Sequence, residues 1–145
     1  MGYYCKRYIT LIDGGQSKLQ ELKSLITSNN EYDWDNIVKL VNVRILSDCD
    51  NNLGGGTKWY EFENDITNAS ERLGNTTIYV LEITEDNNLV EYYLTDGMVQ
   101  KSYIKNDSLD FYSDVMQISR FIDEHLKRIC DYDRYTKQDW LSKQA

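Results

Sequence analysis

The chain has 145 residues, of which 41% are hydrophobic and 12% aromatic, and its 16 basic and 24 acidic side chains give a formal charge of −8. This composition fits one globular domain with its own core and excludes a disordered chain. The acidic balance argues against direct nucleic-acid binding and against adhesion to a membrane, because both need Lys and Arg to meet phosphates. No apolar run approaches the roughly 18 residues of a spanning helix, and no signal-peptide pattern is present, so we expect a cytoplasmic protein.

The first third of the chain predicts a strand, a helix and a second strand. Residues 3–13 are rich in aromatic and β-branched side chains and end at two glycines, which is typical of a strand closed by a turn. Ser17 and Gln20 have the spacing of a capping box, and the leucines that follow form the apolar stripe of a helix. Residues 36–47 favour a strand, although 33–40 could instead form a short helix that leads into it.

The clearest hydrophobic periodicity follows a loop at 48–56. Apolar residues there are spaced 3, 4, 3 and 4 apart and predict an amphipathic helix. They are Trp59, Phe62, Ile66, Ala69 and Leu73. We expect Thr57 to be the N-cap of this helix and Gly74 to end it as a left-handed cap.

Three strands and a helix are predicted in the second half. The strands are expected at 76–84, 89–95 and 98–104. Residues 85–88 form the first turn between them, and Asp96-Gly97 is a dipeptide preferred in tight hairpin turns. A final helix is expected over about 111–130, before a polar tail from about 131. Its apolar face is predicted to carry Val115, Ile118, Ile122 and Ile129.

The order of these elements is β-α-β-α-β-β-β-α, and no linker or internal repeat divides them, so residues 1–145 are expected to form a single domain. Half-apolar strands and helical stripes must cover each other. The sequence therefore predicts an α+β fold: an antiparallel sheet with helices packed on one face, as in a ferredoxin-like sandwich with an extra C-terminal helix.

Three short segments resemble the YubB-type ferredoxin-like proteins of phages and plasmids. The opening YYCKRYITLIDG resembles the start of that family, GGGTKWYEFENDI resembles its Gly-Thr-Lys-Trp element, and YYLTDG resembles its late strand and turn. The likeness spans about residues 3–104 in scattered pieces, with Tyr4 where the family usually has Trp and Arg7 where it commonly has Asn. The resemblance implies a ferredoxin-like fold and a mobile-element origin.

No residue pattern specifies catalysis, a cofactor or a metal site. The three cysteines, at positions 5, 49 and 130, are far apart and lack a CxxC pair, so we expect reduced cysteines that pack in the fold. His125 is the only histidine and lies at the edge of the last helix's apolar face, where we interpret it as a half-buried structural residue. The start of a calcium loop at 48–52 fails at Leu53 and Trp59, where Gly and Glu are required.

A Gly-rich segment before the second helix is a candidate ligand site. Its residues are Gly54, Gly55, Gly56, Thr57, Lys58 and Trp59. Free backbone N–H groups at such a position suit a phosphate, and the indole offers a stacking surface. The order Gly-Thr-Lys, however, differs from the Gly-Lys-Thr of a P-loop.

All the net charge of the chain belongs to residues 61–96, which hold nine acids and one base, so that the remaining 15 acids and 15 bases cancel. The nine acids are Glu61, Glu63, Asp65, Glu71, Glu82, Glu85, Asp86, Glu91 and Asp96. One interpretation is a solvated face that keeps the protein soluble. The other is a negative surface that imitates phosphates and competes for a basic groove, with aromatic anchors such as Tyr60 and Tyr92.

The sequence predicts a small non-enzymatic interaction protein of a phage or other mobile element, which binds and inhibits or modulates a host protein. The expected partner has a basic surface, and a defence nuclease or another nucleic-acid-handling protein is the natural target. The alternative is a small-ligand or nucleotide-binding domain that uses the Gly-rich segment. An enzyme ranks last, because it would need His125 or a carboxylate pair in a cleft.

Overall fold

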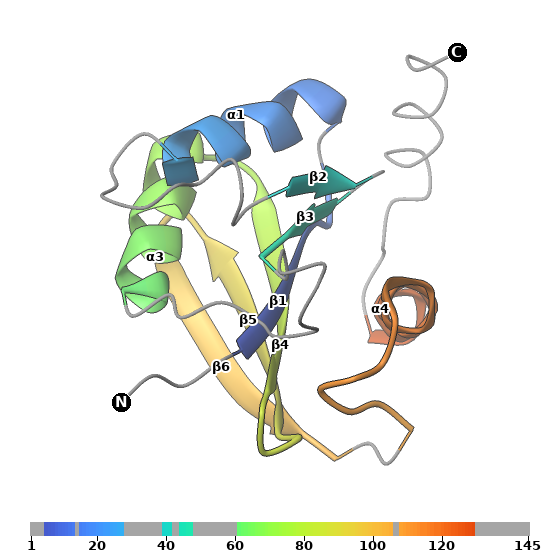
Figure 1. The fold of residues 1–145 in the computed structure, drawn as a ribbon. Coiled ribbons are helices and arrows are strands. Elements are labelled where there is room, and N and C mark those ends of the chain that lie inside the picture. The colour runs from blue at the N-terminus through green and yellow to red at the C-terminus, as the bar shows by residue number, and fades with distance from the viewer. Residues whose placement is uncertain are drawn as a thin grey trace.

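The computed structural model describes residues 5–13, 15–27, 39–41, 44–47, 61–105 and 108–129. Within these ranges, six strands form one antiparallel sheet in the order β2-β3-β1-β4-β5-β6 (Figure 1), which confirms the predicted α+β class. The strands are β1 (Cys5–Leu11), β2 (Lys39–Val41), β3 (Arg44–Leu46), β4 (Thr77–Thr84), β5 (Leu89–Thr95) and β6 (Met98–Ile104). The helices described are α1 (Gln16–Thr27), α3 (Phe62–Leu73) and α4 (Val115–Ile129).

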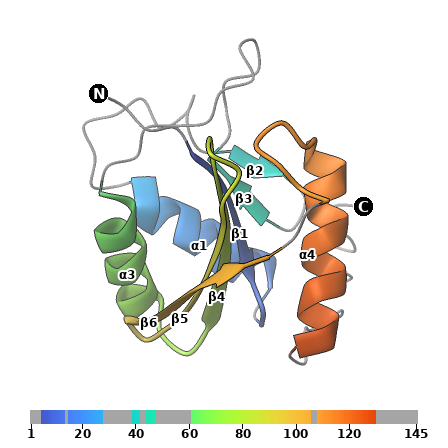
Figure 2. The ribbon, with the colours of Figure 1, turned by 90° about the horizontal axis from the view of Figure 1, so that it is seen from below.

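Helices cover both faces of the sheet. Ile9 and Val80 face α1 and α3 in one buried cluster, whereas their neighbours Tyr8 and Leu81 face α4 in a second cluster. Figure 2 shows α1 and α3 on one side of the sheet and α4 on the other. The prediction that the helices pack on one face is therefore wrong for α4. The central strands β1 and β4 are buried on both faces, and the apolar side chains on each face must be kept from water.

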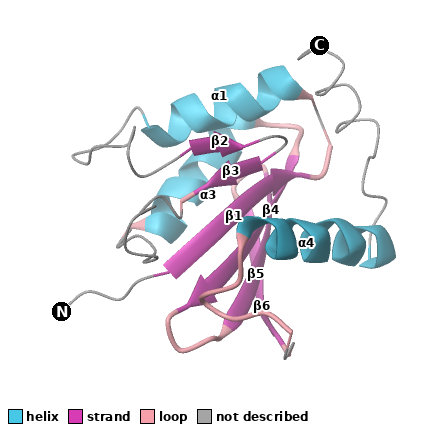
Figure 3. Cartoon of the chain, turned by 45° about the vertical axis from the view of Figure 1, so that its right-hand side comes forward, coloured by secondary structure: helices cyan, strands magenta, loops and turns pink. Residues whose placement is uncertain are grey.

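The pairing of β1 with β4 forms the centre of the sheet (Figure 3). It runs antiparallel over seven residue pairs, from Cys5 opposite Thr84 to Leu11 opposite Ile78. This register sets which side chains of the two strands share a face, because opposite residues in a pair point the same way.

Both predicted turns of the β4-β5-β6 meander are confirmed. Asp96 and Gly97 have φ angles of 51° and 82°, and a type I′ turn requires positive φ at both positions. In the β4–β5 turn the Asn87 N–H donates to the Thr84 carbonyl at 2.8 Å, and the φ of Asn87 is 65°. The predicted bounds of β5 and β6 match the structure.

The strand predicted over 36–47 is instead a short antiparallel hairpin of β2 and β3, in which Leu40 lies opposite Ile45. Two residues, 42 and 43, separate the strands and lie outside the described ranges. The many β-branched and apolar residues of 36–47 suggested one strand. Asn42, a residue type that favours turns, was the signal for two.

The starts of α1 and α3 differ from the prediction. The Leu19 N–H donates to the Gly15 carbonyl at 3.2 Å, so α1 begins at Gln16 and Ser17 lies inside it rather than capping it. Helix α3 begins at Phe62 with Glu61 at the N-cap position and no side-chain capping bond, so Thr57 is not its cap. The end at Gly74 is confirmed, but the predicted left-handed cap is not: φ is 64° and ψ is 152°, an extended conformation with positive φ that favours glycine.

Helix α4 begins at Val115, four residues later than predicted, because a capping box starts it there. The Gln117 N–H donates to Asp114 Oδ1 at 2.8 Å, and the Asp114 N–H donates to Gln117 Oε1 at 3.2 Å. Its buried face carries Ile118, Ile122 and Leu126. Val115, which was predicted on this face, is exposed at the first position of the helix.

Truncation of Ile118 tests whether α4 is part of the cooperative core. Ile118→Ala should lower the free energy of unfolding by about 2–5 kcal/mol, because the side chain is fully buried against the sheet. Met116→Ala, on the same helix but exposed, should change it by less than about 0.5 kcal/mol. Urea denaturation followed by circular dichroism measures both. Equal small effects would mean that α4 does not stabilise the fold.

Candidate functional site

Two of the predicted surface acids lie under the helices, Glu82 buried and Glu91 half-buried, on opposite faces of the sheet. Glu82 is on β4 and points to the face covered by α1 and α3. Glu91 is on β5 and points to the face covered by α4. Neither carboxylate can steer a partner, because each is compensated inside the protein.

Glu82 lies in a polar cluster beneath α3. The Arg7 Nε donates to Glu82 Oε2 at 2.8 Å, and the two side chains are only 8% and 10% exposed. The Tyr92 hydroxyl donates to Glu82 at 3.3 Å, while the Phe62 ring lies 4.3 Å from Arg7 Cζ. Burial, together with the charge of Glu82, raises the pKa of Tyr92 well above its usual value. Tyr92 is therefore a core residue and not the surface anchor that the sequence suggested.

Glu91 joins α4 to the sheet. One of its oxygens lies 2.9 Å from His125 Nε2 and accepts the Tyr79 hydroxyl at 3.0 Å, and the other accepts Ser102 Oγ at 3.4 Å. The Phe121 ring stacks on the imidazole with a centroid distance of 5.3 Å. The predicted half-buried position of His125 at the edge of the helix face is thus confirmed.

A Cys-His pair with Cys5 is not possible in this arrangement. Cys5 is next but one to Arg7 on β1, so its side chain points to the α1 and α3 face, whereas His125 covers the other face. Cys49 lies outside the described residues. The imidazole and the carboxylate of Glu91 act together as a packed contact between helix and sheet.

The other predicted acids are distributed over separate parts of the molecule. Glu61, Glu63, Asp65 and Glu71 belong to α3 or its N-cap, where Glu63 Oε1 lies 3.4 Å from Lys101 Nζ. Asp96 is at the β5–β6 turn and accepts the Asn75 N–H at 3.0 Å. Glu85 and Asp86 are exposed at the β4–β5 turn, at the opposite end of the strands. Residues 61–96 therefore do not present all their acids on one surface.

The Gly-rich segment, residues 54–59, and Tyr60 lie outside the described residues. The alternative function as a ligand-binding domain stays a prediction.

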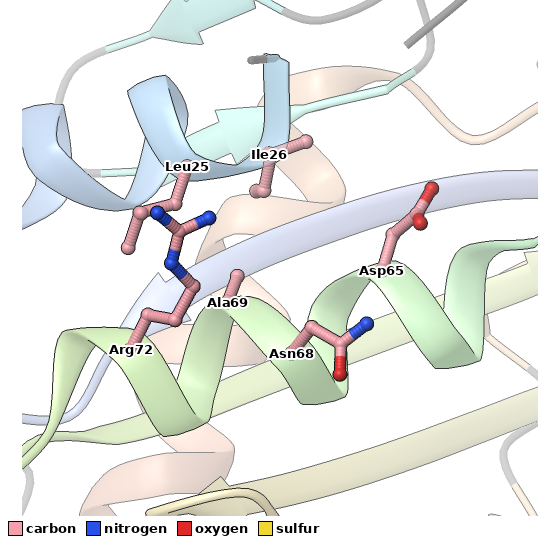
Figure 4. Close-up of a pocket in the computed structure, with 6 residues that line it drawn as sticks. All are labelled: Leu25, Ile26, Asp65, Asn68, Ala69 and Arg72. Atoms are coloured by element: carbon pink, nitrogen blue, oxygen red, sulfur yellow. The ribbon is translucent and has the colours of Figure 1, made fainter. Parts of the chain in front are cut away.

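Hollows in the described part of the chain include the following pair. One, between α1 and α3, has a volume of about 20 Å³, which is room for about one water molecule (Figure 4). The Arg72 side chain reaches toward α1 there (Figure 4). The other is a wide depression of about 370 Å³ beside α4, at Arg120, Phe121 and Glu124. Neither encloses a group of polar side chains that converge on one point.

A more distinctive surface lies where the β4–β5 turn meets the start of α4. We call it the turn–helix surface and define it by Glu85, Asp86, Asp110, Tyr112, Asp114, Val115 and Met116. The Phe111 N–H donates to Asn87 Oδ1 at 2.9 Å and so ties the two segments together. Lys6 Nζ lies 5.0 Å from the centroid of the Phe111 ring and is buried beneath this surface.

The turn–helix surface combines large apolar side chains with carboxylates. Tyr112 is 79% exposed and Met116 is 72% exposed, and both lie within five consecutive residues. Local hydrogen bonds order the segment, since Asp110 Oδ1 accepts the Tyr112 N–H at 2.8 Å and the Asp110 N–H donates to Ser113 Oγ at 2.9 Å.

The sequence interpretation missed this surface because the acids of 110–114 lie outside the charged stretch 61–96. Met116 carried a signal, since it falls off the apolar stripe of the final helix and so cannot face the core. No such signal marks Tyr112, which was predicted inside the final helix. The capping box at Asp114 starts the helix later and leaves Tyr112 in the preceding loop.

No family model, curated protein sequence or solved structure matches this chain. In the described ranges, no helix is both long enough and apolar enough to pass through a bilayer. The same ranges bring no three His, Cys, Asp or Glu side chains together in a way that would hold a metal ion.

Removal of the Glu82 charge should destabilise the protein strongly. Glu82→Gln takes the carboxylate from a buried guanidinium, and loss of one partner of a buried pair costs about 3–5 kcal/mol. The matched control is Glu63→Gln, which breaks the exposed pair with Lys101 and should cost less than about 1 kcal/mol. Chemical denaturation of both variants gives the comparison. Similar values would show that the Arg7–Glu82 pair contributes no more than a surface pair.

The thiol of Cys5 should be unreactive in the folded protein. Burial raises its pKa from 9.0 to about 11; the charge of Arg7 opposes this rise, and the carboxylates of Glu82 and Glu85 add to it. The unfolded thiol ionises near pH 9 and the folded thiol near pH 11, so unfolding releases a proton between these values. The protonated Cys5 thiol therefore contributes to the free energy of unfolding fully below pH 9, and this contribution is lost as the pH rises to 11.

The free energy of unfolding, measured by denaturation at about pH 8 and about pH 11, should therefore fall less between these two pH values in Cys5→Ala than in the native chain. Iodoacetamide labelling followed by peptide mapping gives a second measure, with Cys5 labelled in urea and protected without it. Rapid labelling of Cys5 in native conditions would contradict its burial.

Proposed function

We propose that this chain is a non-enzymatic interaction protein that binds a partner protein with a basic surface through the turn–helix surface. The observation that carries the proposal is the pair of highly exposed apolar side chains, Tyr112 and Met116, among four exposed carboxylates. Large exposed apolar side chains with a polar rim are typical of protein interaction sites.

The apolar part of the surface supplies contact area. Tyrosine is enriched among the residues that dominate binding energy, and methionine adapts to irregular partner surfaces. The local bonds of Asp110 and Asp114 order this segment without the partner, which lowers the entropy lost on binding.

The charged part selects the partner. Glu85, Asp86, Asp110 and Asp114 are exposed, whereas Lys105 is an exposed base near this end of the sheet. A surface with this balance attracts a basic groove and accelerates association at low salt. A nucleic-acid-binding host protein, such as a defence nuclease, offers such a groove, and a phage or plasmid origin of this chain would give it that role.

We also infer that the core belongs to the ferredoxin-like class. The order β2-β3-β1-β4, with α1 after β1 and α3 between β3 and β4, supports this inference. Both helices pack on one face of these four strands. The β5–β6 hairpin and α4 would then be additions, and the YubB-type resemblance stays a proposal that agrees with this arrangement.

The test is a tagged pull-down from a bacterial host lysate, with the affinity for the captured protein then measured by calorimetry. Glu85→Lys with Asp86→Lys should weaken binding at least about tenfold and reduce its salt dependence, because two steering carboxylates become repulsive. Tyr112→Ala with Met116→Ala should weaken it by a similar factor through lost contact area. All four side chains are exposed, so the fold should persist.

The control variant is Glu61→Lys with Glu71→Lys on α3, which changes the net charge by the same amount at a different place. It should bind as the native chain does. Loss of binding in the α3 variant alone would move the site to that helix. Equal affinity in all variants would reject the acidic-surface proposal.

A further inference from the structure

Strand β6 is an exposed edge of the sheet, with only its last residue, Ile104, half-buried. It is seven residues long and pairs with β5 on one side, and in the described ranges no strand lies along its other side. Met98 is 77% exposed and Tyr103 is 75% exposed, although both belong to a regular strand. The opposite edge differs, since β2 has only three residues.

Long edge strands are usually protected against pairing with another chain by proline, a bulge or inward-pointing charge. The chain contains no proline, and the pairing of β6 with β5 is continuous from Met98 to Ile104, without a bulge. Lys101 is the charged residue within the strand. Its amine lies 3.4 Å from Glu63 and 5.4 Å from the centroid of the Tyr92 ring, so it leans over its own sheet rather than guarding the edge.

We propose that β6 pairs with β6 of a second copy of this chain, antiparallel, about a two-fold axis that passes through Lys101. In an antiparallel pair the residues directly opposite point to the same face, so a symmetric pair must be centred on a residue. Centring on Lys101 places Val99 opposite Tyr103 and Met98 opposite Ile104, and each contact occurs twice. This proposal stands independently of the proposed function.

The neighbouring symmetric registers lose these contacts. A pair centred on Gln100 puts Val99 opposite Lys101, and a pair centred on Ser102 puts Val99 opposite Lys105. Only the register centred on Lys101 matches each apolar side chain of the strand with another apolar side chain. A pair of an aromatic and a β-branched residue across two strands, such as Tyr103 with Val99, stabilises a sheet more than a pair of valine and lysine does.

The charges at the axis also balance. Two Lys101 side chains meet there on the face covered by α3, and each copy brings its Glu63 within 3.4 Å of its own lysine. Two positive and two negative groups therefore share the axis. The strand itself carries no acid, so the net charge of −8 does not concentrate at this edge.

Sedimentation equilibrium of the full chain over a concentration series tests the association. The native chain should approach twice its mass of 17.1 kDa as concentration rises. Val99→Lys with Tyr103→Lys should remain monomeric at every concentration, because it places lysine on both sides of the axis. Circular dichroism should show the same fold, since both side chains are exposed. A monomeric native chain, or a dimer that survives both lysines, would overturn the proposal.

Cross-linking tests the register. Cys49 and Cys130 are first replaced by serine, and the Lys101→Cys or Met98→Cys variant is then treated with a short-spacer bis-maleimide. The two copies of the Lys101→Cys variant should be joined across the axis. In the Met98→Cys variant the two new thiols would lie about 20 Å apart, because about six residues of extended strand separate them.

Equal cross-linking of both variants, or of neither, would overturn the register. Self-association would be rejected if the native chain were a monomer. If the Val99→Lys, Tyr103→Lys variant then also failed to capture a host protein that the native chain captures, the edge would be assigned to that host protein.

Discussion

Burial of β1 and β4 on both faces is the constraint on which the rest of the structure depends. Every residue of β1 is buried, and β4 is buried from its second residue onward. One layer of helices cannot protect such strands, so α1 with α3 covers one face and α4 covers the other. Polar side chains on these strands and on β5 then have to find partners within the protein, because an unpaired buried charge costs several kcal/mol.

This constraint separates the charges of the molecule into two groups. Glu82 is held by Arg7 and Tyr92 beneath α3, and Glu91 is held by His125 and Tyr79 beneath α4. These contacts stabilise the positions of the helices and keep both carboxylates from solvent. Of the acids in residues 61–96, those that remain accessible lie on α3 and at the ends of the strands. Binding to a partner therefore depends on where the loops bring acids next to exposed apolar side chains, as they do at the β4–β5 turn.

Local signals in the sequence predicted the elements whose geometry is local. The Asp96-Gly97 turn, the bounds of β5 and β6 and the end of α3 at Gly74 each follow from residues that favour one backbone conformation. The face of a residue on β4 or β5 is not local, because it depends on which helix covers each side. Glu82 and Glu91 belong to the acidic stretch 61–96 and were predicted to be surface acids, because the sequence does not show the register or the position of α4.

The two edges of the sheet differ in how readily a strand of another chain could pair with them. At one edge, the strands of the β2–β3 hairpin are only three residues long and offer little to pair with. At the other, the β5–β6 hairpin extends the sheet by a seven-residue strand that meets α3 on one face and leaves its outer edge unpaired in the described ranges. An axis perpendicular to the sheet at β6 keeps both copies of α4 on one side. The same axis reverses the strand direction, so the two turn–helix surfaces lie at opposite ends of the pair, and each stays accessible to its own partner.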